Sequence, residues 1–308
     1  MIRTSKLRKS YASFDALKGI DLHVQAGDIY GFIGPNGAGK TTTIRILTTL
    51  LEPTSGEAWI DGHSCWEAKE RVRATIGYLP DNFGVYRDMT VTEYLHFFAA
   101  AYAIKPAARP SLVKGLLELV DLDTKADSLI EGLSRGMQQR LGLARTLVHD
   151  PKVLILDEPA SGLDPRARIE IREILKELQR MGKTILLSSH ILPELQEVCS
   201  RIGILERGVL VAQGTVPEIM ASARDDVEIL LSSTDDARAA TLLRELPEVA
   251  RAERDEERDL VSVKLASDLD LAKVSEHLSG RGVHLRRLER HAPTLEQVFM
   301  KLTKGLVA

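Results

Sequence analysis

The chain has 308 residues, and 41 Lys+Arg against 44 Asp+Glu give a formal net charge of −3 at pH 7. This near-neutral balance excludes a strongly basic protein that binds nucleic acid mainly through charge. With 44% hydrophobic and 28% charged residues the composition is that of an ordinary globular protein, long enough for one large domain or two smaller ones.

The two cysteines, Cys65 and Cys199, have neither the number nor the spacing of a disulfide framework or a zinc site. We expect them to be inert packing residues in a reducing, cytosolic setting. Residues 1–10 alternate basic and polar side chains and contain no apolar core of a secretory signal. The longest uncharged run, 94–104, is well short of the roughly 20 residues that a spanning helix needs, so we expect any membrane role to act through another polypeptide.

The first half of the chain predicts strands followed by a helical segment. Strands are expected at 19–24, 28–33 and 57–60, with turns at Ala26-Gly27 and Asp61-Gly62, and a helix is expected at 40–51. Strand signals then stop, and apolar residues at helical spacing predict helices at 92–103, 109–119 and 136–148. We therefore expect a helical subdomain at about 87–150.

The second half returns to strands. Apolar strands at 152–156 and 183–188 flank an amphipathic helix at 165–181, an alternation typical of an α/β fold with a parallel sheet. Near Pro217 the pattern changes to βαββαβ, which suggests a small ferredoxin-like α+β domain. Its expected elements are 227–231, 237–246, 249–254, 260–265, 269–278 and 283–288. The sequence thus predicts two domains, 1–218 and 219–308.

A glycine-rich loop carries the clearest chemical signal. The run Gly34-Pro35-Asn36-Gly37-Ala38-Gly39-Lys40-Thr41 fits G-x4-G-K-[ST] and stands between a predicted buried strand and a helix. Its glycines let backbone N–H groups converge on phosphates, and the helix N-terminus adds partial positive charge. We expect Lys40 to reach the β- and γ-phosphates and the Thr41 hydroxyl to bind Mg²⁺, with Thr42 as a further nucleotide-binding residue.

A second signal is the apolar strand Val153–Leu156, which ends in the acids Asp157 and Glu158. Adjacent side chains on a strand point to opposite sides, so the two acids can do different work. Asp157 suits an anchor for Mg²⁺, directly or indirectly, and Glu158 can polarise an attacking water.

These motifs, with others, resemble a known family in their order and spacing. After the glycine-rich loop come Leu133-Ser134-Arg135-Gly136-Met137-Gln138-Gln139-Arg140, then Asp157-Glu158-Pro159, Ser161-Gly162-Leu163-Asp164 and finally His190. The series resembles the ATP-binding subunits of ABC transporters over residues 11–214. The resemblance implies a P-loop NTPase (RecA-like) parallel-sheet core with N-terminal antiparallel strands, and ATP and Mg²⁺ as cofactors. It also implies an ATPase that closes as a head-to-tail dimer on multi-span membrane permease subunits.

The resemblance also implies roles for single residues. Ser134 and Gly136 open a predicted helix that would present a hydroxyl and free N–H groups to the γ-phosphate bound by the partner subunit. His190 resembles the switch histidine that contacts the γ-phosphate and holds the catalytic water. Asp164 resembles the residue that links the two sites across the dimer. Tyr11 stands where the family often places an aromatic ring against adenine, and Phe14 is a competing candidate.

Some positions depart from the commonest family pattern. Arg135 and Met137 replace a glycine and a glutamine, while the serine and the following glycine are intact. Asp81 stands where the family usually has glutamine. A carboxylate oxygen can approach Mg²⁺ as an amide oxygen can, but it adds charge and removes an amide donor. The segment 81–86 also resembles the loop that touches the membrane subunits, so we expect it to take part in coupling.

The acid at this loop, the Ser-x-Gly-Met pattern and the tail 293–303 look like the ATPase subunits of ABC-2 type exporters. Thr294 and Gln297 form a plausible capping box for the last helix. The subfamily implies a protein that is cytoplasmic and peripheral on the inner face of the cell membrane, where it drives export.

Three other functions deserve comparison. A soluble ABC-type regulatory or DNA-maintenance ATPase typically has a long coiled-coil insertion or two cassettes, whereas this chain has one cassette and a short helical insertion. A P-loop GTPase lacks support because Asn36 and Asn82 are the only asparagines, so the guanine-reading Asn-Lys-x-Asp motif is missing. A nucleotide-binding scaffold without turnover would have to explain the intact Glu158 and His190.

Overall fold

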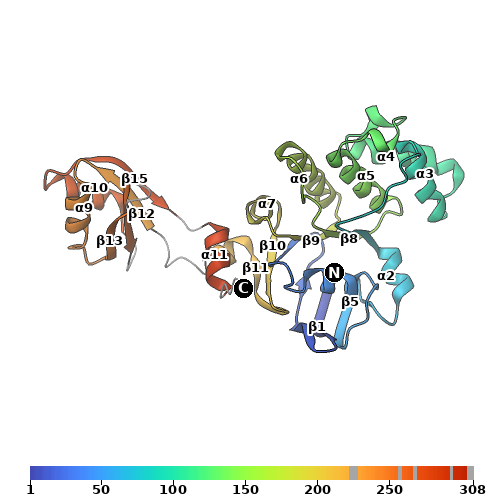
Figure 1. Cartoon of the computed structure of the whole chain (residues 1–308), viewed down its shortest axis with the longest axis horizontal. Coiled ribbons are helices and arrows are strands. Elements are labelled where there is room, and N and C mark those ends of the chain that lie inside the picture. The colour runs from blue at the N-terminus through green and yellow to red at the C-terminus, as the bar shows by residue number, and fades with distance from the viewer. Residues whose placement is uncertain (222–227, 256–258, 266–268, 292–293, 304–308) are drawn as a thin grey trace. The chain divides into compact units, whose positions relative to one another are not determined.

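The structure is a computed structural model that describes residues 1–221, 228–255, 259–265, 269–291 and 294–303. The chain forms two compact units, Met1–Val216 and Pro217–Ala308 (Figure 1). The break falls at Pro217, where the sequence pattern changes, and each unit is described by itself.

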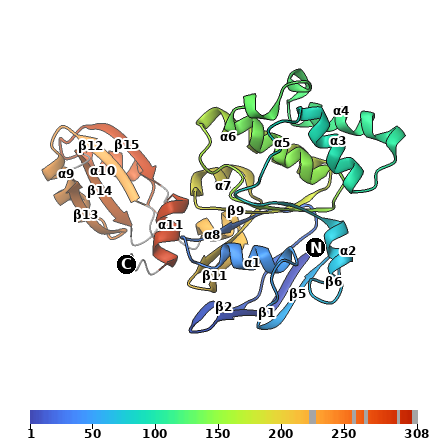
Figure 2. The same cartoon turned by 45° about the vertical axis from the view of Figure 1, so that its right-hand side comes forward.

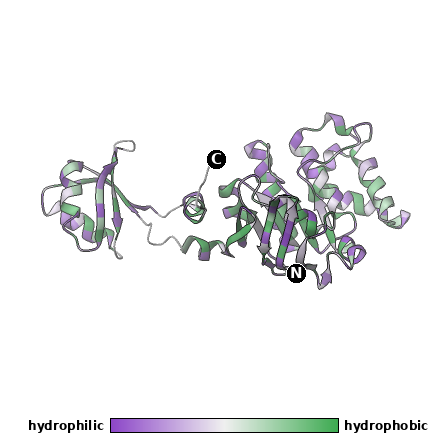
Figure 3. Cartoon of the chain, turned by 60° about the horizontal axis from the view of Figure 1, so that its bottom comes forward, coloured by the Kyte–Doolittle hydropathy of each residue, from purple (hydrophilic) through white to green (hydrophobic). Residues whose placement is uncertain are grey.

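An antiparallel sheet opens the first unit, with strand order β2-β1-β5-β6 and β3 paired to β1. The unit contains both hydrophobic and hydrophilic strand residues, as the colours of Figure 3 show. The bounds are β1 Ile2–Tyr11, β2 Phe14–Ile20, β3 His23–Val24, β5 Ser55–Ile60 and β6 His63–Ser64. The expected single strand at 19–24 is wrong, because the chain divides there into β2 and β3. Strand β1 was not expected at all. Its alternation is interrupted near Lys6, which has φ 46, and its pairing with β5 shifts register between Ser5 and Arg8.

The central sheet has the order β11-β10-β4-β9-β8-β7 and is parallel from β10 to β7. Strands β4, β8 and β9 are buried throughout, as expected for parallel strands covered on both faces. The sequence analysis missed β10 and the antiparallel edge strand β11. The bounds are β4 Ile29–Ile33, β7 Ile76–Leu79, β8 Val153–Asp157, β9 Thr184–Ser189, β10 Arg201–Glu206 and β11 Val209–Thr215.

Helices cover both faces of the central sheet. Helix α1 (Lys40–Leu47) lies between the two sheets, and α6 (Pro165–Arg180) lies on the opposite side with α7 (Leu192–Val198) (Figure 2). The buried side chains of α1 share one apolar core with those of β1. The expected helix at 40–51 ends earlier, at Leu47, because Thr49 takes a left-handed backbone with φ 63. A short helix, α2 (Lys69–Thr75), precedes β7.

The helical subdomain contains α3 (Val91–Ala101), α4 (Arg109–Leu119) and α5 (Arg135–Leu147), with three short 3-10 turns. Every end of these three helices lies within two residues of its expected position. Helix α3 begins with a capping box in which Thr90 and Glu93 satisfy each other's backbone N–H groups. Because their apolar spacing is regular, the helices could be placed from sequence.

The second unit has the expected βαββαβ order, and its sheet order β13-β14-β12-β15 is antiparallel at every pairing. This is the split βαβ arrangement of ferredoxin-like folds. The bounds are β12 Glu228–Ser233, α9 Asp236–Leu243, β13 Val249–Asp255, β14 Leu260–Leu265, α10 Leu271–Ser279 and β15 Leu285–His291. Helices α9 and α10 contribute with the sheet to one apolar core.

Two further helices belong to this part of the chain, α8 (Val216–Ala221) and α11 (Leu295–Leu302). The predicted capping box of the last helix is present, because Thr294 and Gln297 exchange side-chain and backbone hydrogen bonds. Val227, the start of an expected strand, and Pro293 lie outside the described residues. Across the described ranges, every helix is too short or too polar to cross a membrane.

Both cysteines are buried free thiols, in line with a packing role. Burial raises the pKa of Cys65 to about 12 and also raises the pKa of Cys199. Because the thiolate is the reactive form, such thiols are poor nucleophiles at neutral pH.

Two turn glycines of the antiparallel sheet allow a matched stability test. Gly56 and Gly62 have φ of +78° and +79°, but a Cβ at Gly56 would lie 2.2 Å from the Lys6 carbonyl oxygen whereas one at Gly62 would meet nothing within 4 Å. Gly62→Ala should therefore lower the free energy of unfolding by only roughly 1–2 kcal/mol, which is the strain of an alanine in a left-handed backbone conformation. Gly56→Ala should lower the free energy of unfolding by about twice as much or more, because the β1–β5 pairing must also open.

The two tryptophans of the chain, Trp59 and Trp66, report on this sheet, so fluorescence during urea unfolding measures both variants. Equal shifts of the urea midpoint would contradict the steric part of this prediction.

Candidate nucleotide site

The glycine-rich loop joins β4 to α1 and follows a path that side chains would obstruct. Gly39 is the N-cap of α1 with φ 111, and a Cβ there would lie 2.7 Å from Leu17 and 2.8 Å from the Ala16 carbonyl oxygen. A Cβ at Gly34 would lie 2.4 Å from the Leu205 carbonyl oxygen. No side chain caps α1, and its first turn contains no acid. Its N-terminal N–H groups and helix dipole are therefore suited to hold an anion.

Lys40, the first residue of α1, is buried with 6% of its surface exposed. Its ammonium donates to the carbonyl oxygens of Gly34 and, at 3.4 Å, Pro35, and lies 3.7 Å from Glu158 Oε1. Burial lowers the pKa of Lys40, and the nearby carboxylates of Glu158 and Asp157 act in the opposite direction. A buried ammonium costs free energy unless negative charge faces it, so this lysine favours an anionic ligand.

The two acids leave the sheet at the end of β8. Asp157 is 4% exposed, whereas Glu158 has a left-handed backbone with φ 53. Strand alternation was expected to send the two side chains to opposite sides. This is wrong, because Glu158 has already left the strand and both acids line the same pocket. A non-glycine residue in this conformation stores strain, which is common at functional sites.

Ser188 on β9 holds both acids in place. Its hydroxyl donates to Asp157 Oδ1 at 2.6 Å and accepts from the backbone N–H of Glu158 at 2.9 Å. The sequence analysis did not identify this serine. Its only signal was its position at the end of a buried strand beside the strand of the acids.

His190 follows β9 and completes a row of three side chains. Its Nδ1 lies 2.7 Å from Glu158 Oε2, while Glu158 Oε1 is the atom near Lys40. The structure thus brings together all three residues predicted to be catalytic, with Glu158 between the other two.

One pocket of about 320 Å³ gathers most of the residues predicted to hold the nucleotide. Gly34 and Ala38 lie behind it in the buried part of the loop. Tyr11 and Phe14, the two candidates for the adenine contact, are paired across the β1–β2 hairpin, and both line the pocket. The predicted residues that line it are Tyr11, Pro35, Asn36, Gly37, Gly39, Lys40, Thr41, Thr42, Asp81, Asp157 and Glu158.

The remaining predicted residues, Ser134, Gly136 and Asp164, line a different pocket of about 310 Å³. Ser134 is the N-cap of α5 and accepts from the Met137 N–H at 3.3 Å. Asp164 is the N-cap of α6 and accepts from the Ala167 N–H at 3.0 Å. Gly136 lets the two helix starts approach, because a Cβ there would lie 2.8 Å from the Ala167 Cβ. One chain therefore divides the residues predicted to hold the nucleotide between two pockets.

The three oxygen donors predicted for Mg²⁺, Thr41, Asp157 and Asp81, line the phosphate-loop pocket together. The Asn82 amide donates to Asp81 Oδ2 at 3.1 Å. Within the described ranges no group of three or more His, Cys, Asp or Glu side chains could form a complete metal cage. This donor set fits Mg²⁺, which usually takes one or two protein ligands and completes its shell with phosphate oxygens and water.

Comparisons with known proteins agree with this geometry. Residues 17–161 match the family described as "ABC transporter", and residues 214–303 match "ATP-binding protein DrrA1-3-like, C-terminal domain". The chain is 38% identical over 303 residues to the Nod factor export ATP-binding protein I of Paraburkholderia xenovorans, covering 98% of this chain and 96% of the relative. It is 33% identical over 297 residues to the daunorubicin resistance ATP-binding protein DrrA3 of Streptomyces coeruleorubidus, covering 96% and 93%.

Among solved structures, the fold is similar to a dimeric ATP-binding cassette in a post-hydrolysis state bound to ADP and Pi. The TM-score is 0.63 at 26% identity, and the match covers 70% of this chain and 99% of that one. The match covers nearly the whole length of both relatives, and one of them is named as an export protein, which favours a transporter subunit over a soluble regulatory ATPase. The chain therefore belongs to the ATP-binding subunits of ABC transporters, of the ABC-2 exporter type, and is an ATP-binding, ATP-hydrolysing enzyme.

Proposed function

We propose that two copies of this chain close head to tail around two Mg-ATP and that hydrolysis drives separate permease subunits in export. The observation that supports this proposal is the division of the predicted residues between two pockets. One pocket lies at the phosphate loop and the other at the starts of α5 and α6. A second copy would supply its Ser134 to the triphosphate held by Lys40 of the first copy. The dimeric state of the similar cassette bound to ADP and Pi supports this arrangement.

In each composite site the chain's own residues position the reactants and stabilise charge. Lys40 and the N-terminus of α1 hold the phosphates, and Tyr11 or Phe14 stacks on the adenine. Thr41 and Asp157, with Asp81 nearby, would hold Mg²⁺, which neutralises phosphate charge when it is bound. Glu158 accepts a hydrogen bond from the attacking water, and His190, whose Nδ1 lies beside Glu158, contacts the γ-phosphate and holds that water.

An aromatic patch offers a surface for the permease subunits. Tyr86 and Phe97 are 51% and 44% exposed, and their ring centroids lie 5.4 Å apart. Phe98 stacks edge-on against Phe97, and Arg145 covers Phe98. The segment 81–86 connects Asp81 in the nucleotide pocket with Tyr86 in this patch. We propose that this segment couples nucleotide state to permease subunits and holds the protein on the inner face of the membrane.

The names of the two relatives point to different molecules, Nod factor and daunorubicin. We therefore propose export, without a particular cargo, as the function of this chain. We assign cargo recognition to the permease subunits.

Glu158→Gln tests the assignment of the water-polarising residue. The variant should bind ATP but hydrolyse it at least about a hundredfold more slowly, because the amide cannot accept a proton. It should also accumulate as a dimer with Mg-ATP, measured by size-exclusion chromatography with light scattering. Glu177→Gln on the exposed face of α6 is the matched control. Hydrolysis by Glu158→Gln at the parental rate would overturn the assignment.

Complementation between variants tests the shared site. Lys40→Ala and Ser134→Arg should each be inactive as homodimers. In such a homodimer both composite sites lack either the lysine of the phosphate loop or the serine supplied by the other copy. Mixed dimers made by co-expression with two different tags contain one intact site, so their ATPase activity should reappear. Activity that stays absent in isolated mixed dimers, or full activity of Ser134→Arg alone, would contradict the head-to-tail arrangement.

The double variant Tyr86→Ser/Phe97→Ser tests the aromatic patch. It should retain basal ATPase activity in detergent-free solution but lose co-purification with membrane proteins from its native host, because the apolar contact area is gone. Met181→Ser, which changes a residue 55% exposed on another surface, is the control. Undiminished recovery of a multi-span protein with the double variant would rule out the patch as the docking surface.

A further inference from the structure

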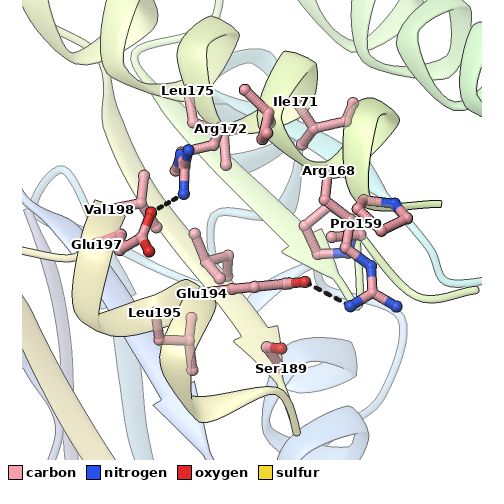
Figure 4. Close-up of a pocket in the computed structure, with 14 residues that line it drawn as sticks. Pro159, Arg168, Ile171, Arg172, Leu175, Ser189, Glu194, Leu195, Glu197 and Val198 are labelled. Atoms are coloured by element: carbon pink, nitrogen blue, oxygen red, sulfur yellow. Dashed lines mark ion pairs between the residues drawn. The ribbon is translucent and has the colours of Figure 1, made fainter. Parts of the chain in front are cut away.

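Helices α6 and α7 enclose a cavity of about 370 Å³ that none of the roles above uses (Figure 4). Its walls are mainly apolar and come from both helices and from β9. The apolar residues include Ile171 and Leu175 of α6, Leu187 of β9, and Leu195 and Val198 of α7. Because this space lies between the two helices, apolar packing between them is incomplete.

Two ion pairs span the gap between the helices, as the dashed lines in Figure 4 show. Arg168 Nη1 lies 3.0 Å from Glu194 Oε1, and Arg172 pairs with Glu197. We call these two pairs the α6–α7 clasp. The carboxylate of Glu194, which lines the cavity, points toward Arg168 (Figure 4).

Arg168 also contacts the segment that precedes α6. Its Nε donates to the Leu163 carbonyl oxygen at 2.9 Å, next to Asp164 at the N-cap. One guanidinium therefore joins the segment 161–164 to helix α7. Burial raises the pKa of Glu194, and Arg168 beside it acts in the opposite direction. The arginine thus favours the charged form of this carboxyl group.

Besides the clasp, the start of helix α7 is anchored by the Ile191 N–H, which donates to Ser189 Oγ at 3.0 Å, and by the buried side chain of Leu192. The helix is seven residues long, has no side-chain N-cap, and begins two residues after His190. Leu195 is buried near Gly31, where an added Cβ would lie 3.3 Å from the leucine side chain. This apolar contact fixes one point of the helix, and the clasp fixes its direction relative to α6.

We propose that Glu194, acting through Arg168, is a positioning residue for His190 and that the clasp ties the placement of this histidine to the segment 161–164. The inference rests on the proposed function for the role of His190. In the proposed dimer Asp164 belongs to the half-site given to the partner, whereas His190 belongs to the chain's own nucleotide pocket. Arg168 is then a side-chain connection between the two half-sites within one chain, beside the backbone that runs from Glu158 to Asp164.

Glu194→Ala tests the clasp by steady-state ATPase kinetics. We expect kcat to fall about tenfold, because a small misplacement of a catalytic group is costly. KM for ATP should change less than about twofold, because the phosphate loop is untouched. Glu177→Ala, which breaks the exposed Glu177–Arg180 pair on the same helix α6, should leave both values unchanged.

Chemical rescue separates positioning from a general loss of structure. The space left by Glu194→Ala should admit acetate or propionate, whose carboxylate can pair with Arg168, and kcat should rise at least threefold with saturation. Methylammonium chloride at equal ionic strength should have no effect. If Glu194→Ala fails to fold, as judged by circular dichroism, Glu194→Gln retains the volume and is measured instead. In that arm, a lower kcat with an unchanged KM supports the proposal, and a parental kcat overturns it.

His190→Ala distinguishes the possible failures. If His190→Ala loses activity but the Glu194 variant retains the parental kcat, the clasp proposal is overturned and the proposed function stands. If His190→Ala retains parental activity, the proposed role of His190 fails and the clasp proposal fails with it. A folded Glu194→Ala whose lost kcat no carboxylate restores would also overturn the positioning role.

Discussion

The parallel pairing of β4, β8 and β9 is the constraint on which the nucleotide pocket depends. Phe32 of β4 pairs with Ser188 of β9, which also pairs with Asp157 of β8. Parallel strands end on the same edge of a sheet, so the loop after β4, the acids after β8 and the histidine after β9 leave the sheet together. Three segments far apart in the chain thereby supply Lys40, Glu158 and His190 to one row.

The charges around this pocket favour an anion, and a second helix start that also favours an anion lies at the other pocket. The ammonium of Lys40 is buried beside the uncapped start of α1, and Glu158 faces it from the opposite side. Helix α5 also begins without an acid in its first turn, but it opens on the other pocket. Each helix start favours an anion, and one triphosphate can satisfy both only when a second chain brings its α5 to the first pocket. The proposed dimerisation would thus follow from where the sheet and the helical subdomain place their helix ends.

Regular patterns in the sequence were sufficient for much of the fold. The apolar spacing of α3, α4 and α5 and the buried runs of β4, β8 and β9 have periods that identify them without tertiary information. Strand β1 escaped detection because the left-handed residue Lys6 interrupts its alternation, and the strand is stabilised by its pairing with β2, β3 and β5. Strand β10 is a six-residue, mainly apolar run that contains Gly203, and periodicity alone does not distinguish so short a run from a buried helix segment.

The sequence by itself determined the chemistry of this protein: the glycine-rich loop, the paired acids and the ordered motifs carry their residue types and spacings in the chain. Only the tertiary structure decided which of those residues meet. It placed Ser188 between the two acids, brought both Tyr11 and Phe14 to the pocket, and kept Ser134 away from Lys40 in the same chain. The physical reason is that spacing along a chain specifies local periodicity, whereas contacts between distant segments depend on sheet register and on backbone conformations, such as that of Glu158, that packing imposes.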